Sequence, residues 1–178
     1  METLDAAPET GGSAPQHTAH HRWAFWGAAA VVVAADQATK TLIRTFMDRG
    51  ETWPSADWPV RLKYVTNTGA AFGILQDQTV FLTVMALIGL AAIYVYYRYP
   101  PFQHWVATLA IGMMLGGAVG NLIDRIIRGR VTDFIDFPRF PSFNIADSSI
   151  TVGVAIIIIG YLLLEARKEA PAPSDADA

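Results

Sequence analysis

Four long apolar runs constrain what this chain can fold into. They cover about residues 23–45, 79–97, 105–127 and 148–164. A membrane-spanning helix needs about 20 apolar residues, with a range of roughly 17–25, and the first three runs have that length. The fourth run is shorter but carries no charge. We therefore expect a mainly α-helical membrane protein with four transmembrane helices.

The segments outside these runs have a different composition. Residues 1–22 are rich in Ala, Pro, Gly, Thr and His without an apolar period, and residues 166–178 end in EAPAPSDADA. Such segments cannot bury enough apolar surface to fold, so we predict two disordered tails around one four-helix domain, residues 23–165. Acidic residues near the start replace the positive charge of a signal peptide, which favours a retained first helix over a cleaved signal.

The loop between the first two runs, about residues 46–78, contains a strand pattern. In VRLKYVT, residues 60–66, apolar and basic side chains alternate as on a half-buried strand. Asn67 and Gly69 follow with turn chemistry. Because one strand is not stable alone, we expect a small β-sheet on the membrane surface.

Acidic residues beside the third and fourth runs are the candidates for catalysis. A carboxylate at the centre of a membrane helix costs roughly 2.5–3.5 kcal/mol, so such acids usually have a function. Asp133 follows the third run and Asp147 precedes the fourth. At a helix N-terminus Asp147 is favoured in its charged form, and a second acid pressed against it keeps its proton. Such a pair can activate water against a peptide bond. The alternative is that Asp147 only caps the fourth helix.

Other polar residues are placed to support such a site. Asp36 and Lys40 stand four apart in the first run, and they either neutralise each other or support a site on another helix. In the third run, small residues every four positions form a ridge that lets another helix approach closely. This ridge consists of Gly112, Gly116 and Gly120. The same helix ends in three polar residues that face one interface: Asn121, Asp124 and Arg125.

Several function classes are disfavoured by what the sequence lacks. It has no cysteine, so thiol nucleophiles, disulfides and thiolate metal sites are excluded, and no HExxH or GxSxG motif occurs. We therefore expect no metal and no cofactor. A net charge of −3 gives no basic field for nucleic acid. Two alternatives remain: a dyad of Ser148 or Ser149 with Lys40, and a multi-pass transporter or proton relay that uses the same intramembrane acids.

Four blocks of the sequence resemble those of the lipoprotein signal peptidases, also called signal peptidase II or prolipoprotein signal peptidase. The blocks are DQATK at 36–40, NTGAAFG at 67–73, GGAVGNLIDRIIRGRVTDFIDF at 116–137 and FNIADSSITVG at 143–153. The likeness covers nearly all of residues 23–165, with the blocks in order between the four apolar runs.

The resemblance implies a membrane aspartic endopeptidase. Such an enzyme removes the signal peptide from diacylglyceryl-modified prolipoproteins by cutting before the lipidated cysteine. Its catalytic aspartates would be Asp133 and Asp147. The positions that would support or line the site are Asp36, Lys40, Asn67, Gly69, Asn121, Asp124, Arg125 and Asn144.

The resemblance also implies a place in the cell. It indicates a multi-pass protein of the bacterial inner membrane, with both termini in the cytoplasm and the active site near the outer face. Counting Lys and Arg beside the runs favours the opposite orientation, because positive charges usually stay inside. The expected partners are the prolipoprotein substrates and membrane lipid, and we expect a monomer.

Overall fold

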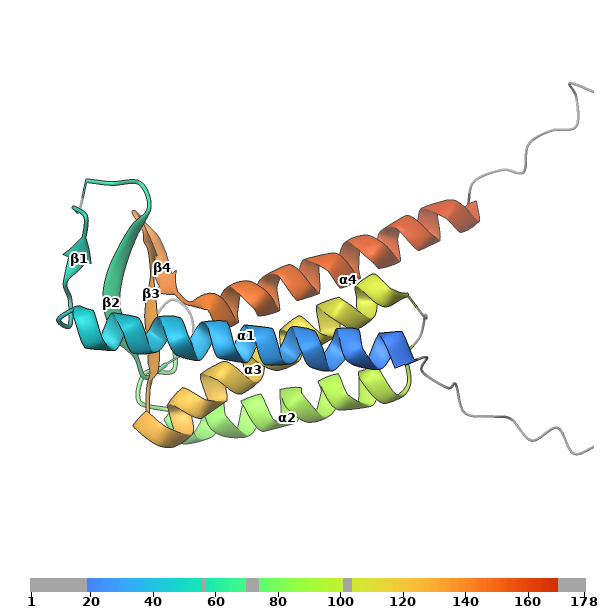
Figure 1. Cartoon of the computed structure of the whole chain (residues 1–178), viewed down its shortest axis with the longest axis horizontal. Coiled ribbons are helices and arrows are strands. Elements are labelled where there is room, and N and C mark those ends of the chain that lie inside the picture. The colour runs from blue at the N-terminus through green and yellow to red at the C-terminus, as the bar shows by residue number, and fades with distance from the viewer. Residues whose placement is uncertain (1–18, 56, 70–73, 101–103, 170–178) are drawn as a thin grey trace, which may run out of the picture.

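The computed structural model describes residues 19–55, 57–69, 74–100 and 104–169, which form four helices and four short strands. The helices are α1 (Ala19–Phe46), α2 (Thr79–Arg98), α3 (Trp105–Arg128) and α4 (Ile145–Glu169). The strands are β1 (Thr52–Trp53), β2 (Arg61–Asn67), β3 (Val131–Phe137) and β4 (Phe140–Phe143). The sheet lies at one end of the helical bundle, and α1 begins and α4 ends at the other (Figure 1). The predicted tails fall mostly on residues 1–18 and 170–178, which lie outside the described residues.

Three helices within the described residues are long and apolar enough to cross a membrane: Thr79–Arg98, Trp105–Arg128 and Ile145–Ala166. They match three of the four predicted runs. The first run forms α1, which has 28 residues but carries Asp36, Lys40 and Arg44 in its C-terminal half. Because charged side chains are unfavourable in lipid, composition alone does not assign α1 to the membrane. The prediction of four spans is therefore confirmed only in part.

The central helix of the bundle is α3. In its most apolar stretch 56% of residues are buried, against 0% in α2 and 11% in α4. It packs against α1, α4 and α2, which are arranged around it (Figure 1). A buried cluster of Phe25, Tyr97 and Ile111 joins α1, α2 and α3. The exposed apolar faces of α2 and α4 are typical of helices that contact another apolar phase.

Glycines in α3 allow its neighbours to approach closely. A Cβ added at Gly116 would lie 2.7 Å from the carbonyl oxygen of Ala29 in α1. One added at Gly120 would lie 2.6 Å from Oδ2 of Asp36. At Gly117 an added Cβ would meet the backbone of α4 instead. The predicted packing role of the glycine ridge is confirmed, and Gly117 extends this packing to a second helix.

The strands form one antiparallel sheet in the order β1-β2-β3-β4. The predicted strand at 60–66 is confirmed as β2, which pairs with β3. In this register Val65 lies opposite Asp133, and Asn67 lies opposite Val131. Asn67 is therefore a diagonal neighbour of Asp133 and within reach of its side chain. The sheet thus places Asn67, from the segment between α1 and α2, beside the strand that follows α3.

The glycine packing predicts different effects on thermal stability for two similar substitutions. Gly116→Ala should lower the melting temperature in detergent, because the new methyl group would meet the backbone of α1. Gly89→Ala is the matched control, since a Cβ at Gly89 in α2 would meet nothing within 4 Å. Alanine there should leave the melting temperature unchanged or raise it, because it favours helix over glycine by about 1 kcal/mol. Equal shifts in the two variants would contradict the packing role.

Candidate active site

A fully buried lysine joins α1 to α3. Lys40 Nζ lies 2.8 Å from Oδ2 of Asp36 and 3.5 Å from Oδ2 of Asp124. It also donates a hydrogen bond to Oδ1 of Asn121 at 2.9 Å. Lys40 and both aspartates have no exposed surface. Because an uncompensated charge in such a place is strongly destabilising, the three charged residues act as one unit.

Asp36 also holds the start of α4. Its Oδ1 accepts the backbone N–H of Ala146 at 3.0 Å. Gln37 donates to Oδ2 of Asp36 at 3.0 Å and to the carbonyl oxygen of Gly120 at 3.0 Å. An N–H in the first turn of a helix lacks an intrahelical partner and favours a carboxylate. The Asp36–Lys40 pair therefore connects α1, α3 and α4, beyond neutralising two charges in one helix.

The start of α4 is capped by Asn144. Its Oδ1 accepts the N–H of Asp147 at 2.9 Å, and Oδ2 of Asp147 accepts the N–H of Asn144 at 3.3 Å. This reciprocal pair is a capping box, in which the acid stands three residues after the cap. Asp147 is thus part of the cap, as considered from the sequence, but it uses only one oxygen there. Its Oδ1 is directed to Asn121.

Asparagine side chains orient both candidate catalytic carboxylates. Asn121 donates from Nδ2 to Oδ1 of Asp147 at 2.7 Å. Asn144 donates from Nδ2 to Oδ1 of Asp133 at 2.7 Å, and Asn67 donates to Oδ2 of Asp133 at 3.1 Å. Each carboxylate therefore accepts a hydrogen bond on each oxygen, which fixes its orientation.

The carboxyl group of Asp133 titrates near neutral pH. Asp133 stands in β3 and is only 3% exposed. Burial, and then the charge of Asp147, raise the pKa of its carboxyl, and hydrogen bonds from Asn67 and Asn144 lower it; together these effects place the pKa at about 6. A carboxyl with such a pKa can both take up and release a proton near neutral pH, as acid–base catalysis requires.

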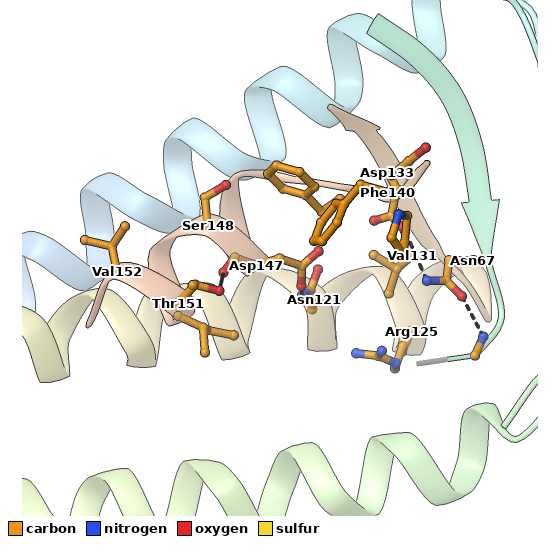
Figure 2. Close-up of a pocket in the computed structure, with 15 residues that line it drawn as sticks. Asn67, Asn121, Arg125, Val131, Asp133, Phe140, Asp147, Ser148, Thr151 and Val152 are labelled. Carbon is orange, nitrogen blue, oxygen red and sulfur yellow. Dashed lines mark hydrogen bonds between the residues drawn. The ribbon is translucent and has the colours of Figure 1, made fainter. Parts of the chain in front are cut away.

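Both aspartates line one cavity of about 560 Å³. The polar part of its wall also contains Asn67, Asn121 and Arg125, which gather around the two aspartates (Figure 2). Gly69 lines the cavity as well, and its backbone N–H donates to Oδ1 of Asn67 at 2.9 Å. This contact turns the amide of Asn67 so that its NH₂ group faces Asp133.

The rest of the cavity wall is mostly apolar. It comes from the strands β3 and β4 and from the first turns of α4. Its apolar side chains are Val131, Phe140, Pro141, Phe143, Ile150 and Val152. A site of this kind fixes a ligand with a few polar groups and surrounds it with apolar surface.

The structure brings all ten predicted site residues together. The six that line the cavity are Asn67, Gly69, Asn121, Arg125, Asp133 and Asp147. The four that lie behind it are Asp36, Lys40, Asp124 and Asn144, each without exposed surface. Their catalytic and binding roles stay predictions.

Sequence reasoning missed three residues that complete the polar network. Gln37 bonds Asp36 and the backbone of α3, as described above. Arg44 donates to both Asp124 and the hydroxyl of Thr132, and Thr132 is 2% exposed. One available signal was that Arg44 stands four residues after Lys40 and so lies on the same face of α1.

The geometry disfavours the two alternative functions, a Ser–Lys dyad and a proton relay. Ser148 and Ser149 donate to backbone carbonyl oxygens of their own helix, at 2.9 and 2.8 Å, while Lys40 is held by Asp36, Asp124 and Asn121. These contacts do not form a Ser–Lys dyad. A proton relay should distribute acids through the membrane depth, whereas these acids gather in one network at the sheet end of the bundle.

Comparison with known proteins gives a consistent result. Residues 28–163 match the profile of the family described as Signal peptidase (SPase) II. The lipoprotein signal peptidase of Shouchella clausii is 43% identical over 142 residues, which are 79% of this chain and 93% of that protein. The lipoprotein signal peptidase of Caldanaerobacter subterraneus is 46% identical over 137 residues, 76% of this chain and 92% of that protein.

Two solved structures share the fold. Both are described as bacterial membrane enzymes determined by the in meso method. The first has a TM-score of 0.75 at 36% identity and covers 83% of this chain and 92% of its own. The second has a TM-score of 0.69 at 38% identity and covers 76% of this chain and 90% of its own.

The buried ion pairs predict a large difference between two substitutions near Asp124. Lys40→Met should destabilise the protein by about 3–5 kcal/mol, because it leaves buried carboxylates without their cation. Arg128→Met is the control: Arg128 lies 3.9 Å from Asp124 but is 36% exposed, so its loss should cost less than about 1 kcal/mol. Thermal unfolding in detergent measures both. Similar losses of stability would show that Lys40 is not the cation on which the network depends.

Proposed function

Because this chain belongs to the signal peptidase II family of proteases, we propose that it cleaves diacylglyceryl-modified prolipoproteins before the lipidated cysteine with an Asp133–Asp147 pair. The observation that carries the proposal is the arrangement of these two carboxyls. They come from different elements, β3 and α4, yet they line the same cavity. Each is held by asparagine contacts, and these hold the carboxylate in place for reaction.

In the proposed reaction the two carboxyls share one proton and use one water. The ionised carboxyl takes a proton from the water while the oxygen of that water attacks the scissile carbonyl carbon. The protonated carboxyl donates a hydrogen bond to the carbonyl oxygen, on which negative charge develops. When the peptide bond breaks, the leaving amine takes up a proton from the pair. The raised pKa of Asp133, about 6, supports a pair that holds such a proton.

The remaining predicted residues are assigned supporting roles. Asn121 connects the buried Lys40 to Asp147, so the position of Asp147 depends on the network behind it. Asn144 orients Asp133 in the same way. On the cavity wall, we assign the guanidinium of Arg125 to backbone carbonyl oxygens of the substrate, which its planar donor group suits.

We further propose that α1 is the fourth transmembrane helix. Its 28 residues span about 42 Å at roughly 1.5 Å per residue, enough to cross a hydrocarbon core of about 30 Å. The charges in its C-terminal half have partners inside the bundle, which removes much of their cost in lipid. The proposed domain, residues 23–165, functions as a monomer without the two tails.

The proposed orientation places both termini in the cytoplasm and the sheet at the outer face of the bacterial inner membrane. Figure 1 supports the part of this orientation that puts both termini on one side, since α1 begins and α4 ends at the same end of the bundle, opposite the sheet. The site then lies where the signal peptide leaves the membrane and the lipidated cysteine that follows it in the precursor meets the outer interface.

The dyad predicts that neither carboxyl works alone. Asp133→Asn and Asp147→Asn should each abolish cleavage of a lipidated precursor, measured as a size shift with purified protein. Near-normal turnover in either variant would remove that residue from the catalytic role.

The raised pKa of Asp133 predicts how the stability of the protein depends on pH. A carboxyl whose pKa is about 6 when folded and 3.8 when exposed destabilises the fold as pH rises through this interval. The wild type should therefore lose more thermal stability between pH 4 and 7 than Asp133→Asn does. Equal losses would contradict the raised pKa and remove its support for a shared proton.

The lipid on the substrate should raise the cleavage rate by positioning the scissile bond. Acyl chains in the bilayer would hold the scissile bond at the depth of Asp133 and Asp147, since each buried CH₂ contributes about 0.8 kcal/mol. An unlipidated precursor should therefore be cut far more slowly than its lipidated form by the same enzyme in the same membrane. Equal rates would place recognition in the peptide and in the loop 46–78 instead.

A further inference from the structure

We propose that Arg44 is a positioning residue, which holds the start of β3 and thereby sets the place of the Asp133 carboxyl. This inference rests on the proposed function. Arg44 stands in the last turn of α1, and its side chain is 14% exposed. It does not line the cavity, so any effect it has on the reaction passes through other residues.

The guanidinium of Arg44 binds groups on two other elements. Nη1 lies 3.3 Å from Oδ1 of Asp124 in α3 and donates to the hydroxyl oxygen of Thr132 in β3 at 3.1 Å. Nη2 donates to the hydroxyl oxygen of Thr41 at 3.0 Å, which holds the side chain against its own helix. Such divergent contacts suit the rigid planar fork of arginine and not the single ammonium of lysine.

Thr132 is held from several sides. Its backbone N–H donates to Oδ2 of Asp124 at 3.1 Å, and its hydroxyl accepts from Arg44. Its carbonyl oxygen accepts from Nδ2 of Asn144 at 3.4 Å, the same NH₂ group that binds Asp133. Asp124 and Arg44 therefore fix the residue immediately before Asp133 by backbone and side chain together.

This arrangement assigns different tasks to the two cations of α1. Lys40 binds Asp36 and, through Asn121, acts on Asp147. Arg44 binds Oδ1 of Asp124 and, through Thr132, acts on the strand that carries Asp133. The contacts of Lys40 thus lead to Asp147 and those of Arg44 to the residue before Asp133, and the two sets of contacts meet at Asp124 and through Asn144, which donates to Asn121 at 3.2 Å. The relative position of the two carboxyls then depends on α1, which itself contributes no residue to the cavity wall.

The test compares kinetics of Arg44→Met, Arg44→Lys and Thr132→Val, with Arg128→Met as the control for loss of a positive charge beside Asp124. The assay uses the purified full chain and a diacylglyceryl-modified precursor. Arg44→Met should lower kcat about 10- to 100-fold with little change in KM, because small misplacement of a reacting group has effects of this size. Arg128→Met should leave kcat unchanged, since Arg128 has a distant, exposed contact. Arg44→Lys should recover stability but not kcat.

Two further measurements separate positioning from a purely structural role. Combining Arg44→Met with Thr132→Val should lower kcat no further than Arg44→Met alone, because both remove the same contact. Hydrogen exchange should become faster in residues 131–133 of the Arg44→Met variant and stay unchanged in α2.

Three outcomes would overturn the inference: additive losses in the double variant, equal kcat in Arg44→Met and Arg128→Met, or a lower melting temperature with normal kcat for the folded fraction. If the wild type fails to cleave the lipidated precursor, the proposed function is overturned instead. The exchange rates in β3 would then still test the contact itself.

Discussion

The structure depends on one buried positive charge. Lys40 is enclosed by groups from α1 and α3, and only their combined presence makes its burial tolerable. Two consequences follow for the fold. The rotation and depth of α1 against α3 are fixed, because an ammonium group must meet Asp36, Asp124 and Asn121 together. The start of α4 is fixed as well, because Asp36 uses its second oxygen on the backbone of that helix.

Close packing and buried polarity require each other here. Because glycines leave one ridge of α3 without side chains, the backbones of α1 and α3 approach closely. Short polar side chains can then reach across the interface. At Gly120 this is direct, since the space that a methyl group would take is occupied by the carboxylate of Asp36. The ridge is thus part of the polar network as well as of the apolar packing. This explains why glycines and charged residues occur together in one short stretch of α3.

Local patterns in the sequence predicted most of the elements and the proposed pair. The strand alternation at 60–66 and the spacing of Asp36 and Lys40 are visible within a few residues. The contacts of Arg44 with Thr132 and of Asn144 with Asp133 depend on tertiary structure. Arg44 and Thr132 are 88 residues apart, and no local period indicates that they meet. The sequence left open whether Asp147 only caps α4; in the structure Asn144 is the cap and Asp147 is its partner in the capping box. The membrane status of α1 was hardest to predict, since only part of its charge is neutralised within the helix by the Asp36–Lys40 pair, and Arg44 is paired with Asp124 in α3.

The order of synthesis gives these long-range contacts a consequence for assembly. Asn121, which accepts from Lys40, follows 81 residues later in the chain. At roughly 5–20 residues per second, α1 leaves the ribosome several seconds before its partners exist. Under the four-span arrangement, its charged half must remain beside water or lipid headgroups during that interval. Insertion of α1 is then completed together with α3, so biogenesis should proceed through a late pairing step and not by independent entry of each helix.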